Sequence, residues 1–188
     1  MTPILGILAS GMSGNLWAPG KDFDSIASYT VGSGGINSVT FSSIPSTYRH
    51  LQVRYLSRDT STGQYFTVQF NSDTSTSSYT WHYLNGDGST ATAGNATTGT
   101  FPGAVINYTA GAGTSIFSAG VVDILDYTNT NKYKTIRTLN GYDANGSGVV
   151  NLTSSLWLNT TAITSIKFLF DGSNNIDQYS SFALYGVK

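Results

Sequence analysis

The sequence predicts an all-β fold, an antiparallel β-sandwich of jelly-roll-like form with an extended N-terminal arm. The chain of 188 residues has no glutamate, because all ten of its acidic residues are aspartate, and it has 25 serines and 25 threonines. Glutamate is a good helix former, whereas Asp, Ser and Thr compete with the hydrogen bonds of a helix. With 21 glycines, 12 tyrosines and 9 phenylalanines, the composition favours strands and turns. We therefore expect a helix content below about a tenth, well under the usual third.

Short runs of alternating apolar and polar residues follow one another from Phe23 onward. The alternation is clearest in residues 50–57 and 64–71, where every second side chain is apolar and is expected to face inward. Turn-forming clusters separate the runs at the spacing of a sandwich or barrel. The expected strands are 23–31, 36–41, 50–57, 64–71, 79–84, 101–108, 116–127, 132–139, 149–158, 163–170 and 179–187. The expected core includes Leu51, Val53, Phe66, Val68, Phe70, Ile124, Ile166 and Phe168.

Turn signals also predict how some of these strands are connected. Residues 116–127 and 132–139 are expected to form one hairpin, and residues 163–170 and 179–187 to form the last one. Residues 85–100 are rich in Gly, Ser, Thr and Ala, so we expect a long exposed loop there.

Residues 1–22 are expected to form an N-terminal attachment arm, ahead of a single sandwich domain at residues 23–188. The stretch 2–17 has no charge and is interrupted by glycines, which disfavour a helix. Its large apolar side chains have to be covered, either by another subunit or by the chain's own domain. It is too short to span a bilayer and has no basic residues before it, so neither membrane insertion nor a signal peptide is expected. The candidate attachment residues are Ile4, Leu5, Ile7, Leu8, Leu16 and Trp17.

The charge content limits the classes of partner. Only 10% of the residues are charged and the net charge is −1. The chain therefore lacks the basic surface with which proteins bind nucleic acids. Weak charge repulsion between copies favours self-association. The absence of cysteine excludes disulfides, thiolate catalysis and cysteine-bound zinc.

The residues that commonly carry catalysis are sparse. The chain has two histidines, His50 and His82, and no serine in a G-x-S-x-G motif. A catalytic histidine would therefore lack the nucleophile that this motif provides.

Three aspartate pairs are near in sequence, namely Asp22 and Asp24, Asp123 and Asp126, and Asp171 and Asp177. Asp22 and Asp24 are expected on one strand face near a loop, whereas Asp123 and Asp126 are expected on opposite faces of a strand and so cannot converge as catalytic carboxylates. Turns and strand ends explain Asp22, Asp171 and Asp177 better than catalysis does. We therefore expect no catalytic residue, no metal site and no cofactor.

Aromatic side chains are better candidates, because sugars are recognised by aromatic rings together with planar polar groups. Trp81 and Tyr83 come just before the predicted loop 85–100, and Tyr142 lies in a predicted turn. We take these three as candidate ligand-binding residues. The alternative is that they belong to the core, as most aromatic residues of sandwiches do.

Three stretches of the chain match a common pattern in order. The first is residues 2–10 followed by 23–27, the second is 41–54, and the third is 179–188. Shorter matches at 123–127 and 131–135 lie between them, so the pattern runs over nearly the whole chain. In these stretches the sequence resembles a family of small virion proteins of tailed bacteriophages.

The resemblance implies a non-enzymatic virion protein with a β-sandwich body, assembled in the host cytoplasm. We expect it at the tail or a fibre, with a role in attachment to a host-surface glycan. One alternative is a capsid decoration protein that cements the head, and another is a glycan-degrading enzyme of the tailspike type. The implied partners are other virion proteins and further copies of the chain, with a trimer favoured by analogy.

Overall fold

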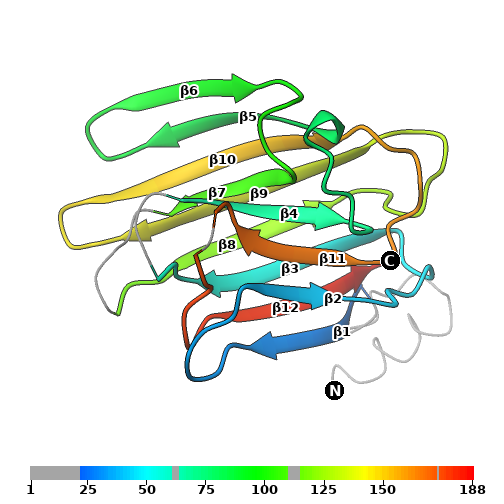
Figure 1. Ribbon diagram of the computed structural model, residues 1–188, viewed down its shortest axis with the longest axis horizontal. Coiled ribbons are helices and arrows are strands. Elements are labelled where there is room, and N and C mark those ends of the chain that lie inside the picture. Colours follow the sequence, from blue (N-terminus) through cyan, green and yellow to red (C-terminus); the bar gives the residue numbers. More distant parts are fainter. Residues whose placement is uncertain (1–21, 61–63, 110–114, 173) are drawn as a thin grey trace, which may run out of the picture.

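The computed structural model describes residues 22–60, 64–109, 115–172 and 174–188. Within these ranges, twelve strands and one short 3-10 helix form two antiparallel sheets packed as a sandwich (Figure 1). The predicted all-β sandwich and the low helix content are confirmed. The strands are β1 (Phe23–Thr30), β2 (Ser38–Phe41), β3 (His50–Ser57), β4 (Gln64–Phe70), β5 (Tyr79–Gly86), β6 (Ala91–Ala96), β7 (Ala104–Thr109), β8 (Ser118–Ile124), β9 (Lys134–Asp143), β10 (Gly148–Trp157), β11 (Ile166–Phe170) and β12 (Ser181–Val187), and the 3-10 helix is η1 (Thr76–Ser78).

Nearly all of the predicted arm, residues 1–21, lies outside the described residues. The same holds for its candidate attachment residues, which are Ile4, Leu5, Ile7, Leu8, Leu16 and Trp17. In the part of the chain that is described, no helix is long and apolar enough to cross a membrane.

Eight of the strands have the arrangement of a jelly roll. β1, β12, β3 and β8 lie side by side in the larger sheet, and β2, β11, β4 and β7 form the smaller sheet facing it (Figure 1). Along the chain, successive strands of this set change sheet, except for β4 and β7, as in a double-sheet jelly roll. The prediction of a last hairpin is wrong, because β11 and β12 lie in different sheets. The connection 171–180 crosses from one sheet to the other instead of turning back.

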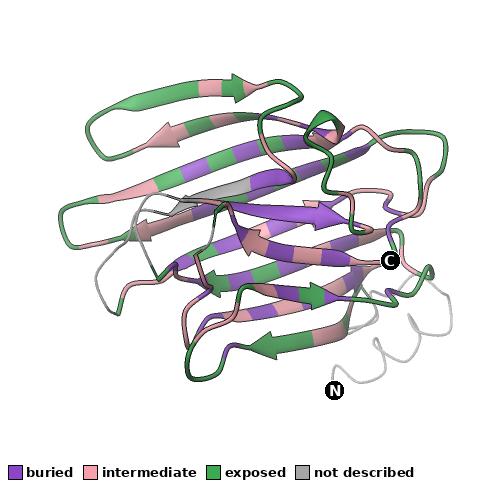
Figure 2. Cartoon of the chain, in the orientation of Figure 1, coloured by how far each residue is buried: buried purple, intermediate pink, exposed green. Residues whose placement is uncertain are grey.

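Two hairpins are inserted into this frame and widen the larger sheet. The β5–β6 hairpin follows β4, the β9–β10 hairpin follows β8, and the two hairpins join through β10 and β5. The predicted loop at 85–100 is therefore wrong, since β6 pairs with β5 along its whole length. The smaller sheet has only four strands, and the edge strand β6 of the larger sheet is mostly exposed, whereas β5 has buried, intermediate and exposed residues (Figure 2).

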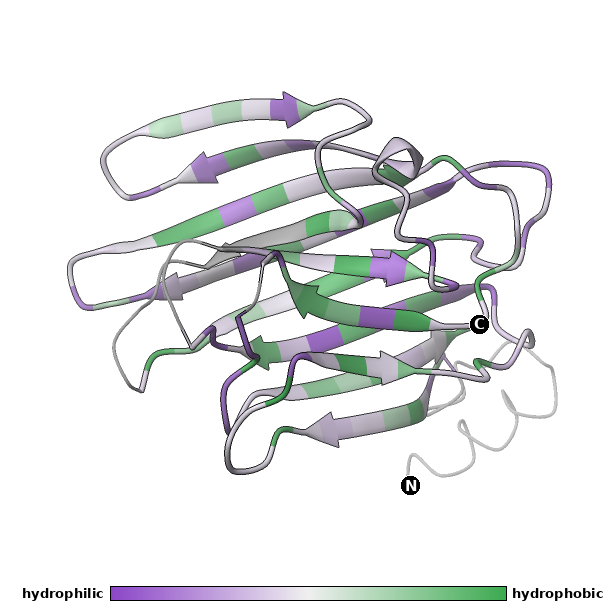
Figure 3. Ribbon diagram, in the orientation of Figure 1, coloured by the Kyte–Doolittle hydropathy of each residue, from purple (hydrophilic) through white to green (hydrophobic). Residues whose placement is uncertain are grey.

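The core lies between the two sheets and consists mainly of aromatic rings. All eight residues of the expected core are at most 1% exposed, which confirms the predicted strand faces. Hydrophobic segments of the paired strands β4 and β11 lie next to each other in the smaller sheet (Figure 3). At the centre, the Phe66 ring lies 4.6 Å from the Phe170 ring, 5.4 Å from Tyr55 and 5.9 Å from Phe182, measured between centroids. Phe66 therefore contacts rings of both sheets.

One lysine is fully buried at the start of β9. The Lys134 Nζ donates hydrogen bonds to the backbone carbonyls of Asn129 at 2.6 Å, Lys132 at 3.1 Å and Thr160 at 3.0 Å. Burial lowers the pKa of Lys134, and the nearby charge of Lys132 lowers it further. The ammonium group thus joins the loop before β9 to the segment that follows β10.

Candidate ligand-binding pocket

A small pocket lies where β5 and β10 of the larger sheet face β4 and β7 of the smaller sheet. It has a volume of about 230 Å³ and is lined by Tyr65, Trp81, Tyr83, Asn85, Val105, Asn151 and Thr153. The register explains the lining, because Thr153 stands opposite Tyr83 and Asn151 opposite Asn85 on paired strands. The volume is below the range of about 300–1,000 Å³ for drug-sized ligands, so the pocket suits a single ring.

Stacked aromatic rings form one wall of the pocket. Trp81 and Tyr83 are two residues apart on β5 and so share its inner face, with ring centroids 5.1 Å apart and planes at 25°. Tyr65 on β4 lies 5.8 Å from Trp81, and Phe101 packs 4.7 Å from Tyr65. Trp81 is only 7% exposed, whereas Tyr65 and Tyr83 are half-buried. The tyrosines are therefore the rings that a ligand can reach.

A glycine on the neighbouring strand fixes the position of Tyr83. Gly94 on β6 pairs with Tyr83, and the tyrosine ring lies over it. A Cβ atom at Gly94 would come within 2.7 Å of that ring, so a larger residue would push the ring aside. The aromatic ring in turn covers the backbone of an exposed edge strand. Sequence reasoning did not single out Gly94, because its role depends on strand pairing.

A chain of side-chain amides forms the polar side of the pocket. Asn151 Oδ1 accepts hydrogen bonds from Asn140 Nδ2 at 3.2 Å and from the Thr153 hydroxyl. Asn151 Nδ2 donates to Asn85 Oδ1, which fixes the Asn85 amide. The Asn85 Nδ2 makes no hydrogen bond to any described residue, so it can donate to a ligand.

No family model, curated protein or solved structure matches this chain. The function of the pocket therefore has to be inferred from its own chemistry. Its described lining contains no carboxylate, imidazole, ammonium or guanidinium group. Aromatic rings beside fixed amides suit an uncharged ligand with both an apolar face and hydroxyl groups.

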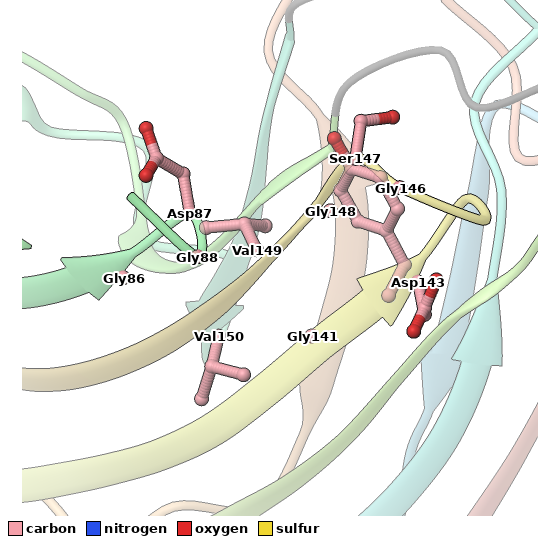
Figure 4. Close-up of a pocket in the computed structure, with 11 residues that line it drawn as sticks. Gly86, Asp87, Gly88, Gly141, Asp143, Gly146, Ser147, Gly148, Val149 and Val150 are labelled. Carbon is pink, nitrogen blue, oxygen red and sulfur yellow. The ribbon is translucent and has the colours of Figure 1, made fainter. Parts of the chain in front are cut away.

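The structure separates the three predicted binding residues. Trp81 and Tyr83 lie together in the pocket, whereas Tyr142 lies at the end of β9, not in a turn, and lines a different hollow. This second hollow, of about 540 Å³, lies between the tips of the β5–β6 and β9–β10 hairpins (Figure 4). Five of its eleven lining residues are glycines, which offer only backbone to a ligand.

The two carboxylates of the hairpin-tip hollow stabilise their own turns. Asp87 accepts hydrogen bonds from the backbone N–H groups of Ser89 at 2.9 Å and Thr90 at 2.6 Å, which lower the pKa of Asp87. Asp143 accepts one from the backbone of Asn145 at 2.8 Å. The two side chains lie apart on different hairpins (Figure 4). Among the described residues, no group of three or more His or Asp side chains could hold a metal ion.

The two histidines lie outside the pocket lining. His82 is exposed and points to the opposite face of β5 from Trp81 and Tyr83. His50 Nδ1 accepts a hydrogen bond from the backbone N–H of Asp126 at 2.9 Å, which stabilises the turn after β8.

Four of the aspartates considered for catalysis contact cationic or amide side chains. Three of them make ion pairs, Asp24 with Lys188 at 2.6 Å, Asp126 with Lys132 and Asp177 with Arg58. Asp123 accepts a hydrogen bond from Gln52 at 2.9 Å. Each of these contacts ties neighbouring strands or loops together.

Proposed function

We propose that the protein is a non-enzymatic structural component of a tailed-phage virion, located at the tail or a fibre, and attaches to a host-surface glycan. The pocket defined by Tyr65, Trp81 and Tyr83 is the binding site. The virion placement comes from the sequence resemblance, and the jelly-roll order of eight strands supports it, since viral capsid and lectin domains use this architecture. Other virion proteins and further copies of the chain are its partners.

The observation on which the glycan proposal rests is the pairing of a half-buried tyrosine with a fixed amide. The Tyr83 ring offers an apolar surface for the C–H face of a sugar ring. Two residues further along the same face of β5, the Asn85 Nδ2 donor is held in place because Asn151 Nδ2 donates a hydrogen bond to Asn85 Oδ1. Preorganised polar groups of this kind fix the orientation of a small ligand.

Binding without hydrolysis fits the same lining. Glycoside hydrolysis ordinarily needs two carboxyl groups on either side of the scissile bond, about 5–9.5 Å apart. The described lining of the pocket provides amides, a hydroxyl group and aromatic rings in their place. We therefore favour an attachment role over the tailspike-type enzyme.

The Tyr83→Ala variant is expected to weaken glycan binding by about tenfold or more, because aromatic contacts in a buried pocket often contribute over 1 kcal/mol. A glycan array would identify the ligand, and isothermal titration calorimetry would measure the dissociation constants. The matched control is His82→Ala, which removes the next side chain along β5 from the opposite face. It should bind as the wild type does.

Two outcomes would contradict the proposal. One is equal loss of binding in His82→Ala and Tyr83→Ala, and the other is release of reducing sugar from the bound glycan.

Immunogold labelling of intact particles would test the placement. Gold at the tail supports the attachment role, whereas gold over the head would support the capsid decoration alternative.

A further inference from the structure

The outer face of the larger sheet, which points away from the smaller sheet, carries exposed aliphatic side chains in adjoining rows. Leu139 on β9 stands opposite Leu152 on β10, which stands opposite Leu84 on β5. These three residues are 58%, 50% and 53% exposed, and Val150 and Leu56 on the same face are 62% and 46% exposed. We call this set the outer apolar face, and it consists of Leu56, Leu84, Leu139, Val150 and Leu152.

The outer apolar face continues over the neighbouring strands with small residues. Ala119 on β8 stands opposite Leu56 on one side and Gly141 on the other. Because Ala119 and Gly141 are small, the surface is depressed between the large side chains. A shallow hollow of about 730 Å³ runs over this part of the sheet. Contiguous exposed apolar surface of this kind is rare on proteins that act alone.

Strand β9 carries two opposite charges on this face, Arg137 within the strand and Asp143 at its end. Alternation places Arg137, Leu139, Gly141 and Asp143 on the same side of the strand. Within the described residues, Arg137 makes no ion pair, and the Asp143 carboxylate accepts only the backbone N–H of Asn145. The stretch 137–143 of this strand thus presents a positive charge, an apolar middle and a negative charge, centred on residue 140.

The other charged residues of the face, Asp123 and Arg54, both hydrogen-bond to Gln52, and Asp123 also stands opposite Arg137 in the strand register. Asp123 accepts a hydrogen bond from Gln52, and Gln52 accepts one from Arg54 Nε at 3.0 Å. The Arg54 guanidinium also lies over the ring of Tyr185 at 5.2 Å. Among the described residues, Arg137 and Asp143 are therefore the charged residues of this face for which no contact with another side chain is seen.

We propose that the outer apolar face is the contact surface between two copies of this chain, with β9 of each copy running antiparallel to β9 of the other. A twofold axis through residue 140 brings each Arg137 opposite the Asp143 of the second copy and packs Leu139 between them. Sheets pack face to face in this way about 10 Å apart. The contact is isologous and closes at two copies, unlike the trimer that the resemblance implies.

The whole outer surface of the larger sheet, of which the outer apolar face is the central part, is large enough for a stable dimer. Eight strands spaced about 4.8 Å apart, over about 20 Å of strand length, give a surface of about 700 Å². A standard interface buries about 800 Å² on each partner. The pocket opens on the inner side of the sheet, so this contact leaves it accessible.

Sedimentation equilibrium of the full-length chain tests the surface. The wild type is expected to be a dimer, and Leu139→Gln to raise the dissociation constant about tenfold or more. The control is Tyr133→Gln, which changes a residue that is 51% exposed in the loop before β9 and should leave the dimer unchanged. A monomeric or trimeric wild type, or a dimer that Leu139→Gln does not weaken, would overturn the proposal.

A charge exchange tests the antiparallel arrangement. Arg137→Asp and Asp143→Arg should each raise the dissociation constant about tenfold, and the double variant should restore it to within about threefold. Circular dichroism would check that every variant is folded. If the double variant stays as weak as the single ones, the proposed pairing is wrong.

Tyr83→Ala should dimerise as the wild type does, so the failure of glycan binding and the failure of dimerisation are distinguishable.

Discussion

The Phe66→Ala variant is expected to lose about 3–5 kcal/mol of its free energy of unfolding, the usual cost of removing a buried phenylalanine ring. Phe66 has no solvent exposure, and its ring lies within 6.0 Å of the Tyr55, Phe168, Phe170 and Phe182 rings, centroid to centroid. These rings come from both sheets, so the cavity would open at the centre of the sandwich. Urea denaturation followed by circular dichroism would measure the loss.

Phe23→Ala is the matched control for this variant. Phe23 lies at the start of the edge strand β1 and is 44% exposed, so its truncation should cost less than about 1 kcal/mol. A loss for Phe66→Ala no larger than that of the control would show that the two sheets do not pack through this ring.

The Lys134→Met variant is expected to be less stable than the wild type by about 2–4 kcal/mol. Methionine retains most of the side-chain volume but leaves the carbonyls of Asn129, Lys132 and Thr160 without their donor. Each hydrogen bond to a charged group contributes about 1.5–3 kcal/mol, partly offset here by removing a buried charge. Thermal unfolding and urea denaturation would measure the change.

Lys132→Met provides a control of the same residue type two positions earlier. The Lys132 side chain is 54% exposed and pairs with Asp126 at the surface, so its loss should change stability by less than about 0.5 kcal/mol. Equal effects of the two substitutions would mean that the three carbonyls do not depend on Lys134.

The strand faces could be predicted where large apolar side chains alternate with polar ones. In β4 the buried residues Phe66, Val68 and Phe70 follow this pattern, so the direction of each side chain was clear. In β6 the side chains are small and mostly exposed, so no pattern separates a strand from a loop. Its conformation follows from pairing with β5, which the sequence of β6 alone does not encode.

Connections between sheets were harder to predict for a related reason. The turn signals at 171–175 mark a change of direction but not the sheet to which the chain returns. In a jelly roll the next strand belongs to the opposite sheet, so β11 and β12 are separated despite their closeness in sequence. The burial of Lys134 could not be predicted either, because a lysine within a polar run usually points to solvent.

Only two residues of the pocket, Trp81 and Tyr83, could be found from the sequence. Trp81 and Tyr83 stand out as neighbouring aromatics on one predicted strand. Tyr65, Asn85 and Asn151 come from three strands, and the register of β10 on β5 brings the two asparagines together. Their shared role depends on tertiary pairing, and so does the contact between Gly94 and Tyr83.

A crystal structure of the protein with the glycan selected on the array would test the central claim most directly. We expect one sugar ring in the pocket, with its apolar face against Tyr83 and a hydroxyl group accepting a hydrogen bond from Asn85 Nδ2. A glycan bound elsewhere, such as between the hairpin tips near Asp87 and Asp143, would contradict the assignment of the pocket as the attachment site.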